Sequence, residues 1–216
     1  MGKPRSPKGR ATLTAERLAG TFPGDAKALC ELNHENAFQL LAATILSAQT
    51  TDVRVNEVTP ALFVKYPTPE ALCAANPEEL EEMIHSTGFF RSKAKSLMSM
   101  ASRLVESFDS EVPHSIVDLT SLAGVGRKTA NVVRSVALNE PGLPVDTHVL
   151  RLSKRLGLTI EDDPVKVELE LNSLVPADQR GVFSLRVILH GRRVCAAKKP
   201  LCGVCVLADF CPSAGL

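Results

Sequence analysis

The sequence lacks any apolar run long enough to cross a membrane. Its most apolar stretch, residues 37–46, is ten residues long and includes a glutamine and a threonine, whereas a spanning helix needs about 20 residues. No apolar segment follows the basic residues at the N-terminus, as it would in a secretory signal. These absences argue against a membrane or secreted protein, so we expect a cytoplasmic protein with no membrane partner.

Regular alternation of apolar and polar residues, the mark of strands, is also missing, and so are internal repeats. Segments with helical periodicity instead follow one another at short intervals. The sequence therefore predicts an all-α chain. The expected helices cover residues 11–19, 36–48, 52–65 with an interruption at Pro60, 69–75, 77–86, 92–107, 115–122, 127–138, 147–156, 164–174 and 179–189.

Capping residues support several of these boundaries. Four polar residues stand where helix N-caps are expected, three of them directly before a proline, and three glycines stand at expected helix ends. The expected caps are Asp52, Thr68, Asn76 and Asp163, and the expected terminating glycines are Gly88, Gly157 and Gly191.

The chain has almost no excess of charge of one sign, but the basic and acidic residues are unevenly distributed along it. The chain has 25 basic and 24 acidic residues, a net charge of +1, which argues against a purely electrostatic binder. Residues 121–216 nevertheless carry 13 basic and 9 acidic side chains, so a polyanion would bind that half. Residues 1–10 mix four basic residues with prolines and glycines, which predicts a disordered basic tail.

The most informative segment is Leu122–Ala130, which contains the run Gly124, Val125, Gly126, Arg127 and Lys128. Glycine tolerates a positive φ, so Gly-Val-Gly can form a tight hairpin. The amides at the start of the helix that follows have no partner within that helix and can bind a phosphate. Lys128 would then lie beside a nucleic-acid backbone. Alternatively, it is an ordinary solvated lysine.

Asp146 lies 18 residues beyond Lys128, directly after a linker at residues 139–144 that is rich in proline and glycine. If the two side chains meet, they meet in a groove between two lobes, where binding sites often form. The simpler interpretation makes Asp146 only the N-cap of the helix that starts at Thr147. Both interpretations can hold together.

Four of the six cysteines, Cys195, Cys202, Cys205 and Cys211, are separated by 6, 2 and 5 residues. In a reducing compartment such cysteines are expected to bind a metal. Structural zinc sites with four cysteines usually combine two C-x-x-C pairs, and only one is present here. A [4Fe–4S] cluster tolerates wider gaps. The spacing favours the cluster over zinc and over redox-active thiols.

Four cations accompany these cysteines: Arg192, Arg193, Lys198 and Lys199. A metal centre that fixes such a loop would make it a rigid phosphate clamp. Alternatively, the charges only keep an exposed loop solvated.

Together these motifs resemble the endonuclease III family, the bifunctional DNA glycosylase/lyases of the helix-hairpin-helix superfamily. The resemblance extends over about residues 13–211. It is carried by the segments Ser47–Asp52, Leu122–Asn131, Val145–His148 and Ile188–Arg192 and by the C-x6-C-x2-C-x5-C pattern.

This resemblance implies two helical lobes with a DNA groove between them. Residues 30–141 would form a six-helix barrel that contains the helix-hairpin-helix. Residues 1–29 and 142–216 would form a lobe that holds a [4Fe–4S] cluster. The implied function is base-excision repair by a monomer associated with a prokaryotic nucleoid, which removes oxidised pyrimidines from duplex DNA and cleaves abasic sites.

The same resemblance assigns roles to single residues. Lys128 corresponds to the amine nucleophile and Asp146 to the essential carboxylate. Gln49 and Phe89 correspond to the residues that fill the gap left by a flipped nucleotide. The family usually has leucine where Phe89 stands, so the resemblance does not define which lesions or opposite bases this chain prefers.

Other functions of the superfamily stay open. An adenine-specific mismatch glycosylase would need a catalytic glutamate where this chain has Thr44, and commonly has serine in place of Lys128. Glycosylases for alkylated bases or pyrimidine dimers differ mainly in the shape of the pocket. A non-catalytic iron–sulfur DNA-binding module would need neither Lys128 nor Asp146.

Overall fold

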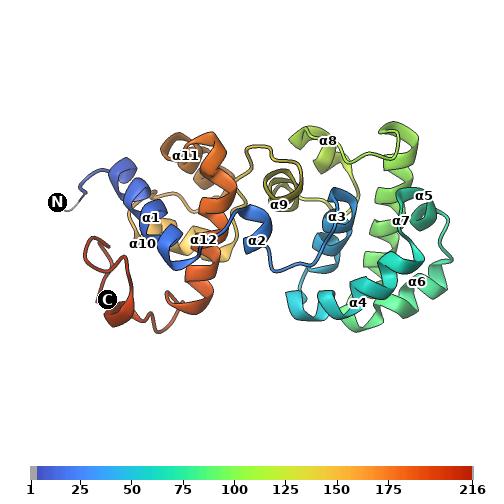
Figure 1. Ribbon diagram of the computed structural model, residues 1–216, viewed down its shortest axis with the longest axis horizontal. Helices are drawn as coiled ribbons and strands as arrows, with labels where there is room; N and C mark the ends of the chain where they lie inside the picture. The colour runs from blue at the N-terminus through green and yellow to red at the C-terminus, as the bar shows by residue number, and fades with distance from the viewer. Residues whose placement is uncertain (1–3, 216) are drawn as a thin grey trace. The chain divides into compact units, whose positions relative to one another are not determined.

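A computed structural model describes residues 4–215, and within that range the chain contains α-helices, three short 3-10 helices and no strand (Figure 1). The all-α prediction is confirmed. Residues Cys30–Asn139 form one compact unit, and the described residues on either side of it form a second. None of the described helices combines the length and apolar character that a membrane span requires.

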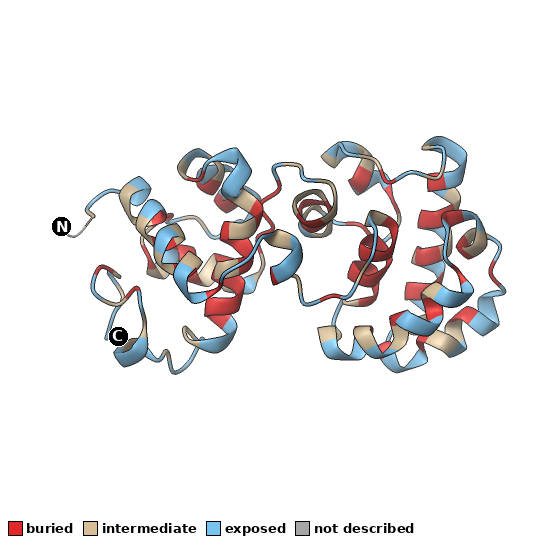
Figure 2. Cartoon of the chain, in the orientation of Figure 1, coloured by how far each residue is buried: buried red, intermediate tan, exposed pale blue. Residues whose placement is uncertain are grey.

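The unit Cys30–Asn139 is built around a buried helix, α3, of which every residue except Ala37 is buried (Figure 2). This helix contacts α4, α7 and α9, so its apolar side chains have neighbours on all sides. The unit comprises α3 (Ala37–Leu46), α4 (Asp52–Lys65), α5 (Pro69–Cys73), α6 (Pro77–Ile84), η1 (His85–Thr87), α7 (Phe90–Ser107), α8 (Ile116–Ser121) and α9 (Arg127–Ala137).

In the second unit α12 contacts α1, α2 and α10, and α11 contacts α1 and α10. Phe183, 1% exposed, lies in the core of this unit. The unit comprises α1 (Pro7–Thr21), α2 (Ala26–Leu29), α10 (Thr147–Arg155), α11 (Pro164–Leu174), η2 (Ala177–Gln179), α12 (Arg180–Arg193) and η3 (Cys202–Val204).

Three of the four predicted N-caps are confirmed: the side chains of Thr68, Asn76 and Asp163 accept backbone N–H groups in the first turns of α5, α6 and α11. The prediction of Asp52 as a cap is wrong by one residue. Thr51 Oγ1 accepts the Arg54 N–H at 3.3 Å, so Asp52 is the first helical residue.

The predicted interruption at Pro60 is also wrong, because α4 runs through it. Pro60 is exposed, while Val55 and Leu62 of the same helix are buried. Packing of this apolar face offsets the hydrogen bond that proline cannot donate.

The basic tail predicted over residues 1–10 is wrong from Pro7 onward. Ser6 caps α1 by accepting the Gly9 N–H at 3.1 Å, and Pro7 occupies the first helical position, where its missing N–H costs nothing. Arg10 is tied to the fold, since its Nη2 donates to the Gly157 carbonyl at 2.5 Å. Residues 1–3 of that predicted tail lie outside the described residues.

Gly191 does not end a helix as predicted. It lies within α12, and a Cβ at this position would come within 2.8 Å of the His148 side chain. The glycine therefore permits a close approach of α10 to α12. Gly88 and Gly157 do follow helix ends, with φ of +69° and +63°.

Candidate DNA-binding and cluster sites

The hairpin between α8 and α9 has the tight turn that its two glycines predict. Gly124 has φ +77°, and the Val125 N–H donates to the Leu122 carbonyl at 3.1 Å. Val125 is buried at 6% exposure, which anchors the turn against the unit. Gly126 has φ −87° and is the N-cap of α9. Only the first glycine is therefore required by its backbone conformation.

Space also requires glycine at position 124. A Cβ there would lie 3.0 Å from the Ser96 Cβ and 3.4 Å from Ile45 Cγ2. The turn thus rests directly on α3 and α7. At Gly126 an added Cβ would meet nothing within 4 Å, which leaves the backbone open to solvent at the start of α9.

Lys128 is exposed in the first turn of α9. No side chain caps this helix at Gly126, and the partial positive charge of a helix N-terminus favours an anion there. An exposed amine beside such an end can reach a bound phosphodiester backbone. This placement, within Cys30–Asn139, suits a nucleophile for nucleic-acid chemistry.

Asp146, in the second unit, is the N-cap of α10. Its Oδ1 accepts the N–H groups of His148 at 2.8 Å and Val149 at 2.9 Å. The side chain is half-buried. The capping interpretation is correct, and these two bonds hold the carboxylate in one orientation. A fixed, partly exposed carboxylate can also stabilise positive charge on a substrate.

Gln49 and Phe89 share an unusual backbone conformation. Their φ angles are +55° and +49°, in the left-handed region, where a residue with a Cβ is strained by about 1–2 kcal/mol. Both side chains are exposed, and Phe89 is 67% exposed. A strained residue with an exposed apolar ring contributes little to the core, which is typical of a functional position.

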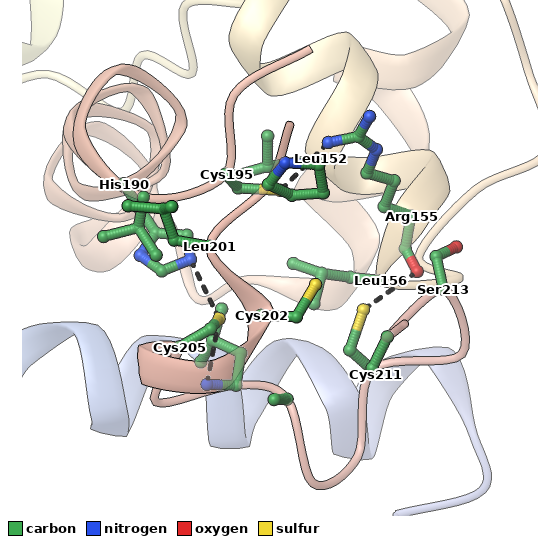
Figure 3. A pocket seen from close by; sticks show the side chains of 15 residues that line it. Leu152, Arg155, Leu156, His190, Cys195, Leu201, Cys202, Cys205, Cys211 and Ser213 are labelled. Atoms are coloured by element: carbon green, nitrogen blue, oxygen red, sulfur yellow. Dashed lines mark hydrogen bonds between the residues drawn. The ribbon is translucent and has the colours of Figure 1, made fainter. Parts of the chain in front are cut away.

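Cys195, Cys202, Cys205 and Cys211 surround one cavity (Figure 3). The cavity encloses about 440 Å³ with its open mouth, and its walls are largely apolar. All four are free cysteines. Burial and the neighbouring cysteines raise the thiol pKa of Cys205 and Cys211. Among residues 4–215, no three His, Cys, Asp or Glu side chains form a site for a single metal ion.

Nitrogen atoms of neighbouring residues lie within hydrogen-bond distance of two of these sulfur atoms, those of Cys195 and Cys205. Arg155 Nη1 lies 3.2 Å from Cys195 Sγ, and the Leu207 N–H donates to Cys205 Sγ at 3.4 Å. His190 Nε2 lies 3.4 Å from the same Cys205 Sγ (Figure 3). Such donors stabilise thiolates, so this donor set fits a cluster held by four cysteines.

Sequence reasoning missed two arginines that hold the loop of residues 195–211. Arg151 Nη2 donates to the carbonyls of Gly191 at 3.2 Å and Cys195 at 2.9 Å. Arg155 donates to the carbonyls of Ala196 at 2.8 Å and Ala197 at 2.7 Å. Their i, i+4 spacing on α10 was a usable signal, because it places both on one helix face.

The four predicted phosphate-binding cations lie around the first cysteine and are exposed. Arg192 and Arg193 end α12, and the Arg193 guanidinium lies 5.6 Å from the centre of the Phe22 ring. Lys198 and Lys199 lie in the loop between Cys195 and Cys202. The same loop that the arginines of α10 hold in place therefore carries two of the cations.

Comparison with protein families gives two matches. Residues 42–177 match the model of the HhH-GPD superfamily of base excision DNA repair proteins. Residues 195–211, the segment from the first to the last of the four cysteines, match the iron–sulfur binding domain of endonuclease III. The prediction of an iron–sulfur cofactor is thereby confirmed.

Individual relatives cover nearly the whole chain. Endonuclease III of Synechocystis sp. is 53% identical over 99% of this chain and 97% of its own length. Endonuclease III of Bacillus subtilis is 44% identical over 91% of this chain and 89% of its own length. A non-covalent endonuclease III–DNA complex superposes with a TM-score of 0.88 at 41% identity, over 96% of each chain. A trapped covalent endonuclease III–DNA intermediate gives the same TM-score at 43% identity and the same coverage.

Proposed function

Because this chain belongs to the endonuclease III family of the HhH-GPD superfamily, we propose that it excises oxidised pyrimidines from duplex DNA and cleaves the resulting abasic sites. The observation that carries this proposal is an exposed lysine, Lys128, at the first turn of the helix that follows the hairpin. Binding of a phosphate alone does not require an amine at this position, because the backbone N–H groups at the start of α9 can supply it. Duplex DNA with a damaged pyrimidine or an abasic site is the substrate, and a monomer in the cytoplasm, at the nucleoid, acts on it.

We assign the nucleophile to Lys128. In its neutral form the amine attacks C1′ of the damaged nucleotide, a C1′–N bond forms, and the glycosidic bond breaks with its electron pair going to the departing base. The base takes up a proton. Opening of the sugar ring gives an iminium between Lys128 and C1′, which acidifies the C2′ protons. Loss of one of them then expels the 3′ phosphate by β-elimination.

Asp146 is assigned the electrostatic part of this reaction. Positive charge develops at C1′ as the glycosidic bond breaks, and a carboxylate stabilises it. The two N–H groups that bind Oδ1 hold the carboxylate of Asp146 in one orientation. Oδ2 is then the oxygen that faces the substrate or accepts a proton.

The hairpin supplies the contact to the DNA backbone. We propose that the backbone at Gly124, Val125, Gly126 and Arg127 surrounds a phosphate, as the open start of α9 allows. Such a contact is independent of sequence and places the strand relative to Lys128.

Gln49 and Phe89 are assigned to the space that the flipped nucleotide leaves. Both are exposed and both belong to the unit Cys30–Asn139. Enzymes that act on a base remove it from the stack, and the remaining bases then need a partner. A phenyl ring stacks on such bases, while the amide of Gln49 offers hydrogen bonds to the orphaned base.

We propose that Cys195, Cys202, Cys205 and Cys211 ligate the [4Fe–4S] cluster, and that the two compact units are the barrel and cluster lobes. The cluster, when bound, cross-links the loop of residues 195–211. Arg192, Arg193, Lys198 and Lys199 then present their charges from a fixed backbone to DNA phosphates.

Borohydride trapping on duplex DNA with an abasic site tests the proposal. The wild type is expected to form a covalent protein–DNA adduct that resists denaturation, because borohydride reduces the iminium. Lys128→Ala should form none, whereas Lys95→Ala, which removes an exposed lysine of α7, should trap like the wild type. Equal, background-level trapping by the wild type and Lys128→Ala would rule out the lyase.

A further inference from the structure

Two separate loops hold the residues assigned to the DNA gap. Gln49 lies between α3 and α4, and Phe89 lies between η1 and α7. Both adopt a left-handed backbone conformation, with φ of +55° and +49°. Non-glycine residues keep such a conformation only where the surrounding structure determines it. Contacts with the surrounding structure must therefore hold each of these two conformations.

Lys93 connects the two loops. This residue of α7 is 5% exposed. Its Nζ donates to Thr50 Oγ1 at 2.8 Å and to the Thr87 carbonyl oxygen at 2.8 Å. Thr50 directly follows Gln49, and Thr87 precedes Phe89 by two residues. The Thr50 hydroxyl also donates to the Thr87 carbonyl, so one ammonium and one hydroxyl bind the two loops to each other.

Packing alone does not explain why a lysine occupies this buried position. Burial penalises the charged form and lowers the pKa of Lys93. Among the described residues no carboxylate forms an ion pair with it. Methionine would fill the same space without a buried charge. An ammonium offers what an apolar side chain cannot, several N–H donors on one atom for acceptors on two loops.

We propose that Lys93 is a positioning residue that fixes Gln49 and Phe89 for insertion into the DNA stack. The inference rests on the proposed function, because it acts through the two residues assigned to the gap. Lys93 itself touches no DNA. Its effect is to keep both loops in the inserting conformation before DNA binds, so that binding does not have to order them.

The first measurement separates insertion from chemistry. A duplex with a tetrahydrofuran abasic analogue cannot undergo excision, and 2-aminopurine next to it fluoresces when unstacked. Wild type should raise this fluorescence, and Lys93→Met should lose most of the rise. Lys95→Met removes an exposed charge from the same helix and should behave like the wild type. Unchanged fluorescence with Lys93→Met would overturn the proposal, and so would a wild type that causes no rise.

The second measurement is a double-mutant cycle on single-turnover excision of an oxidised thymine. Lys93→Met should slow excision by about ten- to a hundred-fold, because loss of the residues that position the flipped nucleotide misplaces the substrate. In a Gln49→Ala/Phe89→Ala background it should slow excision by less than about two-fold. An equal loss in both backgrounds would mean that Lys93 does not act through these residues.

Thermal unfolding is the control for a folding defect. Lys93→Met should have a Tm at least as high as that of the wild type, because the substitution removes a buried charge. Thr50→Val, which removes the hydroxyl on the other side of the connection, should lower the fluorescence in the same direction. Failure of the proposed function is distinguishable: a wild type that never traps on abasic DNA but unstacks 2-aminopurine in a Lys93-dependent way would refute the lyase and leave this inference standing.

Discussion

The hairpin at Gly124–Gly126 and the loop of residues 195–211 are both proposed to bind DNA phosphates, yet they are held in opposite ways. The conformation of the hairpin is set largely by residues close in the sequence: it has a helix on each side and the bond from Val125 to Leu122, and its buried valine packs against the rest of the unit. The loop contains only the three-residue η3. Its contacts come from distant side chains, among them Arg151 and Arg155. The conformation of the hairpin therefore depends mainly on residues close in the sequence, whereas that of the loop depends on tertiary contacts and on its cofactor.

Removal of the cluster should give the largest difference between the loop and the hairpin. Structural metal centres contribute on the order of 10 kcal/mol to the folding of their domains. Oxidation followed by iron chelation should abolish the visible absorbance and expose the amides of residues 195–211 to hydrogen exchange. The Val125 amide should keep its protection. A loop that stays protected without iron would show that the arginines and the apolar walls hold it alone.

Arg155 should give the next largest effect. Arg155→Met removes the contact to Cys195 Sγ and the two bonds to the carbonyls of Ala196 and Ala197. A hydrogen bond from a charged donor contributes about 1.5–3 kcal/mol to stability. We expect faster loss of the cluster to a chelator and faster proteolysis within the loop.

Lys154→Met is the matched control for Arg155→Met. Lys154 is the preceding residue of α10 and forms an exposed ion pair with Asp162, which contributes little. Its chelation rate should equal that of the wild type. If the two variants lose iron equally fast, the bonds of Arg155 do not hold the loop.

The two hairpin glycines should respond differently to alanine. Gly124→Ala forces a Cβ into a left-handed position and against Ser96, which should cost about 1–2 kcal/mol and lower Tm by about 2–8 °C. Gly126→Ala meets open space at φ −87° and should change stability by less than about 0.5 kcal/mol. Thermal unfolding with equal shifts for both would contradict a turn fixed by Gly124.

The sequence predicted those features that depend on neighbouring residues. Periodicity located the helices, and the caps Thr68, Asn76 and Asp163 fixed three of their starts. The errors arose where contacts between residues far apart in the sequence determine the local structure. Gly191 looks like a terminator, but it lies against His148, which is far away in the sequence. The four-residue helix α2 is too short to show a period.

The same distinction applies to the candidate sites. Lys128, Asp146 and the cysteines lie in short motifs, so the sequence could point to each of them. Lys93 could not be found in this way, because its importance comes from Thr50, 43 residues earlier in the chain. A buried lysine has the same appearance in a sequence as an exposed one.

The smallest effect is expected from the loop cations, and it tests whether the loop binds DNA at all. Lys198→Ala with Lys199→Ala removes two exposed charges that make no contribution to the cavity of the cysteines. Each lost phosphate contact should reduce the slope of log Kd against log salt by about 0.9, so the double variant should flatten it by up to about 1.8 and weaken binding to all sequences alike. Lys27→Ala with Lys95→Ala is the control for charge. An unchanged slope in the loop variant would mean that Lys198 and Lys199 do not contact DNA phosphates. The role of the loop would then be structural.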